Sequence, residues 1–280
     1  MHESVLLKES VDCLKVRALG KYIDATLGAG GHSLEILKRG GNVLGIEADK
    51  QMLEIASKNV KPEKWGSRIK LVQGNFRDIG KIARENRFDE VDGVLFDLGI
   101  SSVHLDNDNR GFSFKKPDDY LDMRLDPSIQ AVTAAQLLNS LNERQLSEIL
   151  ESRSMARVVI DKRNESPFEK VSDLLAIFNK RKRGKIHPAT KTFMNLRIAV
   201  NSEYENLESA IPQAFSLLKK SGRIAVISFH SGEDRIVKRY FKKLESEGLG
   251  KVWDLIMTSN EEKKKNKRAR SAKLRIIEKL

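Results

Sequence analysis

The chain has 280 residues, 40% of them hydrophobic and 32% charged, and its 51 basic and 39 acidic residues give a formal net charge of +12. Such a composition is ordinary for a globular protein of one or two domains, and the single cysteine, Cys13, excludes an internal disulfide and a multi-cysteine zinc site. No apolar run approaches the roughly eighteen residues of a membrane helix, so we expect a cytoplasmic protein with no signal peptide, no membrane association and no metal. The positive charge favours RNA or DNA as a partner, with a basic surface that binds nothing as the alternative.

The first hundred residues predict strands alternating with helices. Residues 4–16 fit a short amphipathic helix. Beyond it, the expected strands are 21–25, 43–47, 69–72 and 91–97, and the expected helices are 32–39, 50–60 and 77–86. Because such alternation implies right-handed crossovers, we expect a parallel sheet with helices on both faces.

A glycine-rich turn follows the first expected strand, in the stretch YIDATLGAGGHS at residues 22–33. Glycine lets the backbone approach a ligand, and an acid at the tip of the next strand, here Glu47, can accept the hydroxyls of a ribose. The spacing is not the G-x-G-x-x-G of a dinucleotide site, and a donor without a pyrophosphate, S-adenosylmethionine, suits it better. The alternative is a strand-to-helix turn that needs small residues only for packing.

Polar and aromatic residues also follow the third and fourth expected strands. Phe76 comes shortly after the third strand and Asp97 ends the fourth. Ligands of such sheets bind beyond the carboxyl ends of the strands. We therefore expect Glu47, Phe76, Asp97 and the glycine turn to converge on one crevice.

The alternation stops after Asp97. Residues 98–131 have no sustained period, although two phenylalanines and a run of alternating apolar residues argue against disorder. Helices are expected at 133–150, 155–163 and 171–178, with no strand between them. We therefore predict an all-helical domain at 108–188 for substrate recognition, inserted into a domain made of 1–107 and 189–280.

The sheet is expected to resume after this insertion. A long helical pattern opens at His187 and runs to Leu217, followed by a strand at 223–229, a helix at 233–244 and strands at 252–258 and 273–278. Two strands joined by a loop suggest an antiparallel edge. The total of seven strands with an antiparallel last strand is the Rossmann-like α/β layout of class I methyltransferases, by analogy of fold.

Two runs of basic residues lie between expected elements, at 180–185 and 263–275. We expect each to be a loop that can lie along a phosphate backbone. A solvated tether is the alternative for each.

Several longer stretches carry a resemblance to a known family. They include FDLGISS at 96–102, RGFSF at 110–114, LDMRLD at 121–126, HPATKTF at 187–193, RIAVNSE at 197–203, SFHSGEDRIVK at 228–238 and RARSAKLR at 268–275, besides VLLKE at 5–9 and the glycine turn. Together they make the chain similar to the RsmH/MraW family of bacterial ribosomal RNA methyltransferases. That family methylates the exocyclic N4 of a cytosine in the decoding region of small-subunit (16S) ribosomal RNA, using S-adenosylmethionine.

The resemblance implies a set of cofactor-binding residues. They are Gly30, Gly31, His32, Glu47, Phe76, Asp97 and, in place of a usual glutamine, His104. Glu47 stands where an aspartate is usual, which lengthens the side chain by one methylene. Gly232 replaces a usual leucine and Met194-Asn195 a usual Gln-Ala.

Methyl transfer to an amine needs acceptors for the N–H groups of the nucleophile. The fourth expected strand is followed by the loop 97–102, so Asp97, Ser101 and Ser102 are the candidate catalytic residues, with a purely structural or cofactor-binding role as the alternative. Candidate RNA contacts are Arg110, Phe112, His230, Arg235 and Lys238. A helix cap is the alternative for His230, and a buried position for Phe112.

Two other functions stay open at this point. A nicotinamide-dependent oxidoreductase could use the same scaffold, but the glycine spacing counts against it. A non-catalytic RNA-binding factor for ribosome assembly could retain the fold. The expected partner is small-subunit ribosomal RNA or the 30S particle, and the sequence leaves the oligomeric state open.

Overall fold

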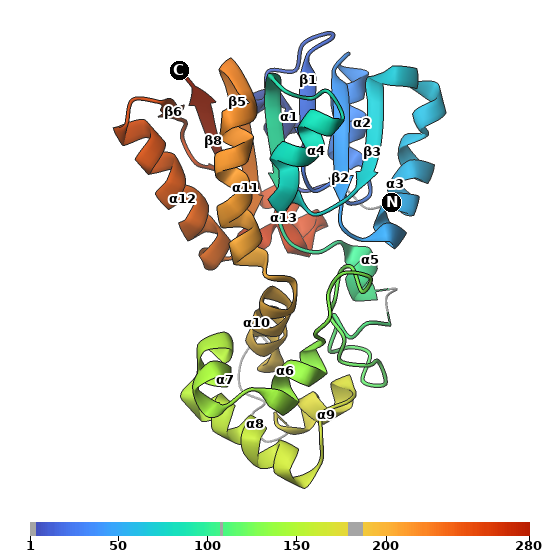
Figure 1. The fold of residues 1–280 in the computed structure, drawn as a ribbon, viewed down its shortest axis with the longest axis vertical. Coiled ribbons are helices and arrows are strands. Elements are labelled where there is room, and N and C mark those ends of the chain that lie inside the picture. The colour runs from blue at the N-terminus through green and yellow to red at the C-terminus, as the bar shows by residue number, and fades with distance from the viewer. Residues whose placement is uncertain (1–3, 107–108, 179–186) are drawn as a thin grey trace. The chain divides into compact units, whose positions relative to one another are not determined.

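The computed structural model describes residues 4–106, 109–178 and 187–280 (Figure 1). It divides into two compact units, each described here by itself. Unit one comprises Met1–Ile100 and Tyr204–Leu280, and unit two comprises Ser101–Glu203. The bounds of unit two are wider than the 108–188 expected for an inserted domain.

Unit one is built on a single sheet. Its strands are β1 (Lys21–Asp24), β2 (Asn42–Glu47), β3 (Ile69–Gln73), β4 (Val91–Asp97), β5 (Leu218–Ser228), β6 (Gly250–Val252), β7 (Ile256–Met257) and β8 (Lys273–Lys279). The strand order is β3-β2-β1-β4-β5-β8-β6, with β7 also paired to β8. The first five strands are parallel, and β8 runs antiparallel to β5, β6 and β7. The expected α/β class I layout is confirmed.

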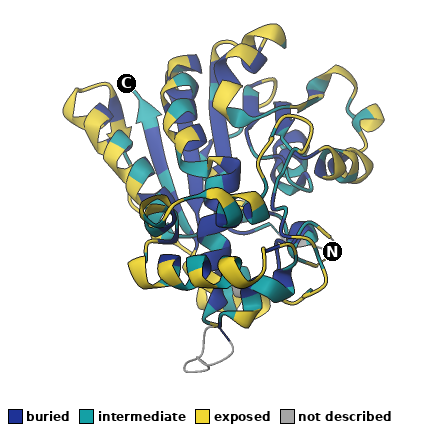
Figure 2. Ribbon diagram, turned by 60° about the horizontal axis from the view of Figure 1, so that its bottom comes forward, coloured by how far each residue is buried: buried dark blue, intermediate teal, exposed yellow. Residues whose placement is uncertain are grey.

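The helices of unit one cover both faces of this sheet (Figure 1). They are α1 (Leu7–Cys13), α2 (Gly31–Lys38), α3 (Lys50–Val60), α4 (Ile79–Glu85), α11 (Glu203–Leu217), α12 (Ser231–Ser246) and α13 (Asn260–Lys265), with short 3-10 turns η1 (Pro62–Lys64), η2 (Gly66–Arg68), η3 (Phe76–Asp78) and η4 (Lys267–Ser271). Neighbouring strand residues face opposite cores. Ile23 and Val94 pack with α4, α11 and α12, whereas Tyr22 and Leu95 pack with α1, α2 and η4. Burial on both faces explains the nearly continuous apolar runs of these strands, which are dark blue in Figure 2.

The edge of the sheet differs from the expectation. The prediction of a single strand at 252–258 is wrong. The structure has two short strands in this region, β6 and β7, so the described residues contain eight strands instead of seven. The chain leaves the strand at Trp253, whose ring packs against the guanidinium of Arg223 at 4.3 Å. The backbone amide of Trp253 still donates to the oxygen of Ile276 in β8 at 3.0 Å, so the gap in the pairing begins after this residue.

Unit two is helical. Its helices are α5 (Ser102–Asp106), α6 (Ala134–Ser140), α7 (Glu143–Leu150), α8 (Arg153–Glu165), α9 (Val171–Ala176) and α10 (Ala189–Asn201). The helix expected at 133–150 is two helices, because Asn142 caps α7 in a reciprocal capping box with Gln145. The helical pattern from His187 to Leu217 is also divided, into α10 and α11, at Ser202, whose φ is 49°.

The basic run expected to form a loop at 263–275 is ordered secondary structure, so that expectation is wrong. It comprises parts of α13, η4 and β8. Ala269 and Ala272, both fully buried, anchor η4 in the core. The other run, 180–185, lies outside the described residues. Within the described ranges, no helix is both long and apolar enough to span a membrane.

Candidate functional site

The glycine turn leads from β1 into α2, as the sequence predicts. Gly28 and Gly30 have φ values of 54° and 85°, in the region that favours glycine. A β-carbon at Gly30 would lie 2.5 Å from Val60 Cγ2, and one at Gly31 would lie 2.2 Å from Ser4 Oγ. A side chain at Gly30 or Gly31 would therefore require Val60 or Ser4 to shift, in addition to the backbone strain at Gly30.

Asp24 lies beneath this turn and is fully buried. One carboxylate oxygen accepts a 2.7 Å hydrogen bond from Ser33 Oγ, in the first turn of α2, and the other accepts one from Thr26 N at 3.4 Å. Burial raises the pKa of Asp24 to about 6, against the lowering effect of these hydrogen bonds. The end of β1 is thus tied to the start of α2 through an acid.

Glu47 ends β2 beside the same turn. Its carboxylate accepts hydrogen bonds from the amides of Gly28, at 2.9 Å, and Asp49, at 3.0 Å. Asp49 in turn caps α3 by accepting from Gln51 N. Burial raises the pKa of Glu47 to about 7, although both amide hydrogen bonds lower it.

Asp97 ends β4, and its backbone amide donates to Thr26 Oγ1 at 2.6 Å. Its Oδ1 is buried without a hydrogen-bond partner among the described residues, and Oδ2 lies 3.8 Å from Nδ1 of His32. Burial and repulsion from Asp24 raise the pKa of Asp97 to about 8. Burial lowers the pKa of His32 to about 4, so this histidine is neutral at pH 7 and does not form a charged pair with Asp97.

Phe76 begins η3, directly after the third strand. Its half-buried ring packs edge-to-face on Phe96 of β4, with 5.8 Å between the ring centroids. Asn75 fixes the turn by accepting from Arg77 N. An aromatic surface thus stands at the end of β3, next in sheet order to the strand that carries Glu47.

Three carboxyl groups with raised pKa values, those of Asp24, Glu47 and Asp97, therefore end or adjoin neighbouring parallel strands. The ionised form of each carboxyl is disfavoured in the free protein, and a ligand that brings positive charge stabilises the ionised forms. His32 Nε2, like Asp97 Oδ1, is buried without a partner in the described part of the chain. These features fit S-adenosylmethionine, which offers hydroxyl and amino donors and a positive sulfur.

Sequence reasoning missed Arg268 as a residue of this site. Its Nη2 donates to the backbone oxygen of Ile100, and its charge lowers the pKa of Asp97. The stretch RARSAKLR at 268–275 indicated that this region matters for function, but its many basic residues favoured the interpretation as an RNA-facing loop. Two other cations of the same run are paired inside unit one, because Lys273 and Arg275 both contact Asp234, at 2.9 and 2.6 Å.

The remaining residues of the expected loop site belong to unit two. Ser101 Oγ accepts from Val103 N at 3.2 Å, and Ser102 begins α5, with its side chain outside the described atoms. His104 is buried, accepts from Ser101 N through Nδ1 and packs on Phe112 with ring centroids 5.3 Å apart. Phe112 is itself 6% exposed. Phe112 is thus buried, whereas Phe114 is only partly buried, and contacts of these residues with cofactor or RNA stay predictions.

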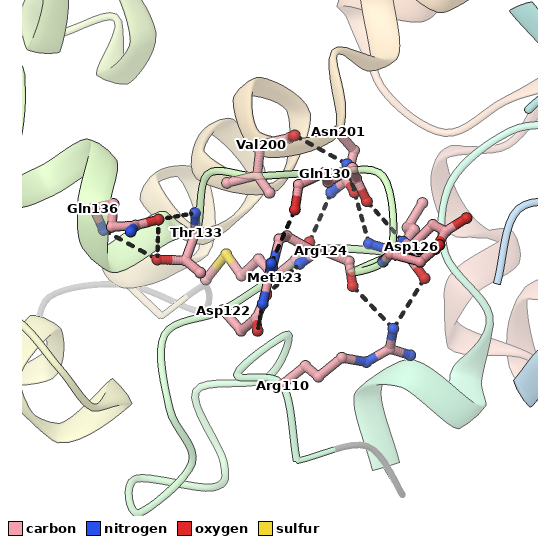
Figure 3. Close-up of polar contacts among 12 residues, drawn as sticks. Arg110, Asp122, Met123, Arg124, Asp126, Gln130, Thr133, Gln136, Val200 and Asn201 are labelled. Carbon is pink, nitrogen blue, oxygen red and sulfur yellow. Dashed lines mark hydrogen bonds and ion pairs between the residues drawn. The ribbon is translucent and has the colours of Figure 1, made fainter. Parts of the chain in front are cut away.

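Arg110 ties down the long loop of unit two (Figure 3). Its Nη1 donates to the backbone oxygens of Arg124 and Leu125, at 2.9 and 3.0 Å. Asn201, at the end of α10, donates to Met123 O and accepts from Leu125 N. This network explains how a segment without periodicity is ordered.

The candidate RNA contacts of unit one lie at or on α12. His230 is the N-cap: its Nδ1 accepts from Glu233 N at 3.5 Å, while Glu233 Oε2 accepts from His230 N at 3.3 Å. The capping alternative is therefore confirmed for His230. Arg235 and Lys238 are exposed on the same helix. Their contact with RNA stays a prediction.

Comparison with known proteins assigns the chain to a family. The model of the MraW methylase family matches residues 1–280. Ribosomal RNA small subunit methyltransferase H of Dehalococcoides mccartyi is 41% identical, over 100% of this chain and 86% of that protein, and the protein of the same name from Fusobacterium nucleatum is 40% identical, over 100% and 97%. An rRNA methylase structure from Streptococcus thermophilus shares the fold, with a TM-score of 0.51 at 12% identity over 100% of this chain and 99% of that chain. This chain belongs to the MraW methylase family.

Proposed function

We propose that this protein transfers the methyl group of S-adenosylmethionine to the exocyclic N4 of a cytosine in the decoding region of small-subunit ribosomal RNA. Methyl transfer follows from the family, which matches the whole chain. The substrate is supported by the relatives, which are named for the RNA of the small ribosomal subunit. The net charge of +12 suits a polyanionic substrate, and a ribosomal substrate implies a cytoplasmic protein.

The observation that carries the cofactor assignment is the convergence of acids on the glycine turn. Glu47 would hold the ribose hydroxyls, Phe76 the adenine, and Asp97 the positively charged part of the donor, while Gly30, Gly31 and His32 line the turn. When bound, S-adenosylmethionine supplies a methyl group on a positive sulfur that is already activated for displacement. The remaining work of the protein is to align the acceptor and to manage its protons.

The cytosine amine is a poor nucleophile because its lone pair is delocalised into the ring. Acceptors for its N–H bonds return that electron density to the nitrogen. We assign this role to Asp97, whose Oδ1 is buried without a partner among the described residues, with Ser101, Ser102 and the carbonyls of 97–102 as further acceptors. The extra proton left on N4 after transfer would pass to Oδ1 of the ionised Asp97 carboxylate, the form that the positive charge of the bound donor favours.

The target base must leave its stack, because an in-line approach to a paired exocyclic amine is blocked. We assign RNA recognition to the helical part of the chain, with Arg110 and Phe112, and to His230, Arg235 and Lys238 at α12. We assign His104 to cofactor binding. The partner is 16S ribosomal RNA, either naked or within the 30S particle.

A transfer assay tests this function. The full chain is incubated with methyl-labelled S-adenosylmethionine and with small-subunit particles or 16S RNA from cells that lack the modification, and the labelled nucleotide is mapped. We expect label on N4 of one cytosine, and none with Asp97→Asn. Tight RNA binding without transfer at saturating cofactor would favour the assembly factor instead.

A further inference from the structure

Arg268 belongs to a part of unit one whose backbone makes several hydrogen bonds. It lies in η4, where Asn266 Oδ1 accepts from its backbone amide at 3.0 Å. The next residue, Ala269, is fully buried, and its backbone oxygen accepts a 2.7 Å hydrogen bond from Thr258 Oγ1. The backbone that carries Arg268 is thus held by packing and hydrogen bonds, which fixes where its side chain begins.

The side chain of Arg268 connects η4 to the end of β4. It donates to the backbone oxygen of Ile100, three residues after Asp97, in the loop that follows the strand. Its positive charge also lowers the pKa of the Asp97 carboxyl. One guanidinium therefore holds the loop after β4 through the carbonyl of Ile100. It also acts electrostatically on Asp97, the acid at the end of that strand.

The surroundings of Asp97 explain why a fixed cation is useful there. Asp24 from β1 and Glu233 from α12 both act on Asp97 as negative charges, and His32 from α2 is neutral. Among the described groups that act on this carboxyl, Arg268 is the one that favours its ionised form. The positive charge of the methyl donor is lost when the methyl group leaves, whereas that of the arginine persists.

We propose that Arg268 is a positioning residue of the methyl-transfer site, which holds the carbonyl of Ile100 and supplies the permanent positive charge beside Asp97. The inference deepens the proposed function and rests on it. It also removes Arg268 from the residues expected to contact RNA phosphates. Arg270, two positions away in the same turn but exposed, is the matched arginine without this role.

The test compares Arg268→Gln, Arg268→Lys and Arg270→Gln. The affinities for S-adenosylmethionine and S-adenosylhomocysteine are measured by calorimetry between pH 6 and pH 9, beside thermal unfolding without ligand. Binding should strengthen as the pH rises through the pKa of Asp97, and the midpoint of this change should lie about one pH unit higher in Arg268→Gln than in the wild type. Near pH 7 the affinity of Arg268→Gln should then be about tenfold weaker. Arg268→Lys should have a midpoint close to that of the wild type because it keeps the positive charge. Arg270→Gln should have the same midpoint and affinity as the wild type.

An unchanged midpoint in folded Arg268→Gln protein would overturn the inference. Should that variant not fold, Arg268→Met, which keeps an apolar stem of related length, should show the same upward shift, and an unshifted midpoint there would overturn the inference equally. In an Asp97→Asn background, Arg268→Gln should no longer move the pH profile. A wild type that binds neither ligand at any pH would instead contradict the proposed function.

Discussion

The carboxylate of Glu47, at the end of β2, accepts a hydrogen bond from the backbone amide of Gly28, with 2.9 Å between Oε2 and the nitrogen. The acid assigned to the ribose thus also holds the glycine turn in place. The site is pre-formed in part by the same group that would bind the ligand.

Replacing Glu47 should therefore weaken cofactor binding in two ways. Glu47→Gln keeps the shape but offers one acceptor oxygen where Gly28 and Asp49 both donate, and it removes the negative charge. A hydrogen bond to a charged group is worth about 1.5–3 kcal/mol, so we expect S-adenosylmethionine to bind about 10- to 100-fold more weakly by calorimetry. Glu54→Gln, an exposed position on α3, is the control that loses the same charge. Equal affinities for the two variants would contradict the role of Glu47.

Asp97 should make the free protein less stable as the pH rises. Its pKa is raised to about 8 in the folded state from an ordinary value of 3.8, so between those values the folded state binds more protons than the unfolded state. The free energy of unfolding then falls with increasing pH, and the loss is complete above about pH 8. Asp97→Asn removes this cost, so we expect its Tm at pH 8.5 to exceed that of the wild type by about 2–4 °C for each ~1 kcal/mol relieved.

The same substitution should abolish methyl transfer, which separates the stability effect from function. As the pH falls from 8 to 5 the difference between the two Tm values should shrink steadily, and it should vanish only below about pH 3.8, where Asp97 is protonated in the unfolded wild type as well. Thermal unfolding without ligand across pH 5–9 measures both. A Tm difference that does not change with pH would show that the carboxyl of Asp97 does not titrate as described.

The glycine turn offers a test of packing against backbone strain. Gly30 and Gly66 both have positive φ values, 85° and 58°, but a β-carbon at Gly66 would have no neighbour within 4 Å. Gly66→Ala should cost only the strain of the left-handed conformation, about 1 kcal/mol. Gly30→Ala adds the clash with Val60, so its loss of unfolding free energy in urea should be larger by about 1–3 kcal/mol, and cofactor affinity should fall with it. Equal losses would mean that Val60 moves aside freely.

The alternation of strands and helices in unit one was predictable, because apolar runs between glycines and acids are local features. The acids at the strand ends, Glu47 and Asp97, were found for the same reason. Their raised pKa values could not be foreseen from sequence, since they depend on how closely separate strands bring the carboxyls together. The break at Ser202 was missed because the pattern of apolar residues continues through it, and the contacts of Asn201 with Met123 and Leu125 come from a loop far away in sequence.

Charge runs were the least predictable feature. Lysines and arginines look alike in sequence whether they face solvent or an internal acid. The run at 263–275 contains both kinds: Arg270 is exposed, whereas Lys273 and Arg275 pair with Asp234. The burial of Ala269 and Ala272 in the core helps to orient this segment, and nothing local in the sequence shows that burial.

The distinction between exposed and paired cations gives the last prediction, on RNA binding. Each lysine or arginine that neutralises a phosphate contributes about 0.7–0.9 to the slope of log K against log salt concentration. Replacing the exposed Arg235 and Lys238 of α12 with glutamine should therefore lower the slope by about 1.5 for 16S RNA. Lys273→Gln should change the slope less per charge, because the ammonium of Lys273 is held 2.9 Å from Asp234, a carboxylate that it shares with Arg275.

A control for net charge is available on another part of unit one. Lys58 and Lys64, exposed on α3 and η1, can be replaced together, which removes two positive charges as the α12 pair does. A general effect of charge would lower the slope equally in both double variants, whereas a local contact at α12 would lower it only in the first. Filter binding between 50 and 300 mM salt distinguishes the two outcomes. Equal slopes would mean that RNA is attracted by the total charge of the protein and that α12 is not part of the interface.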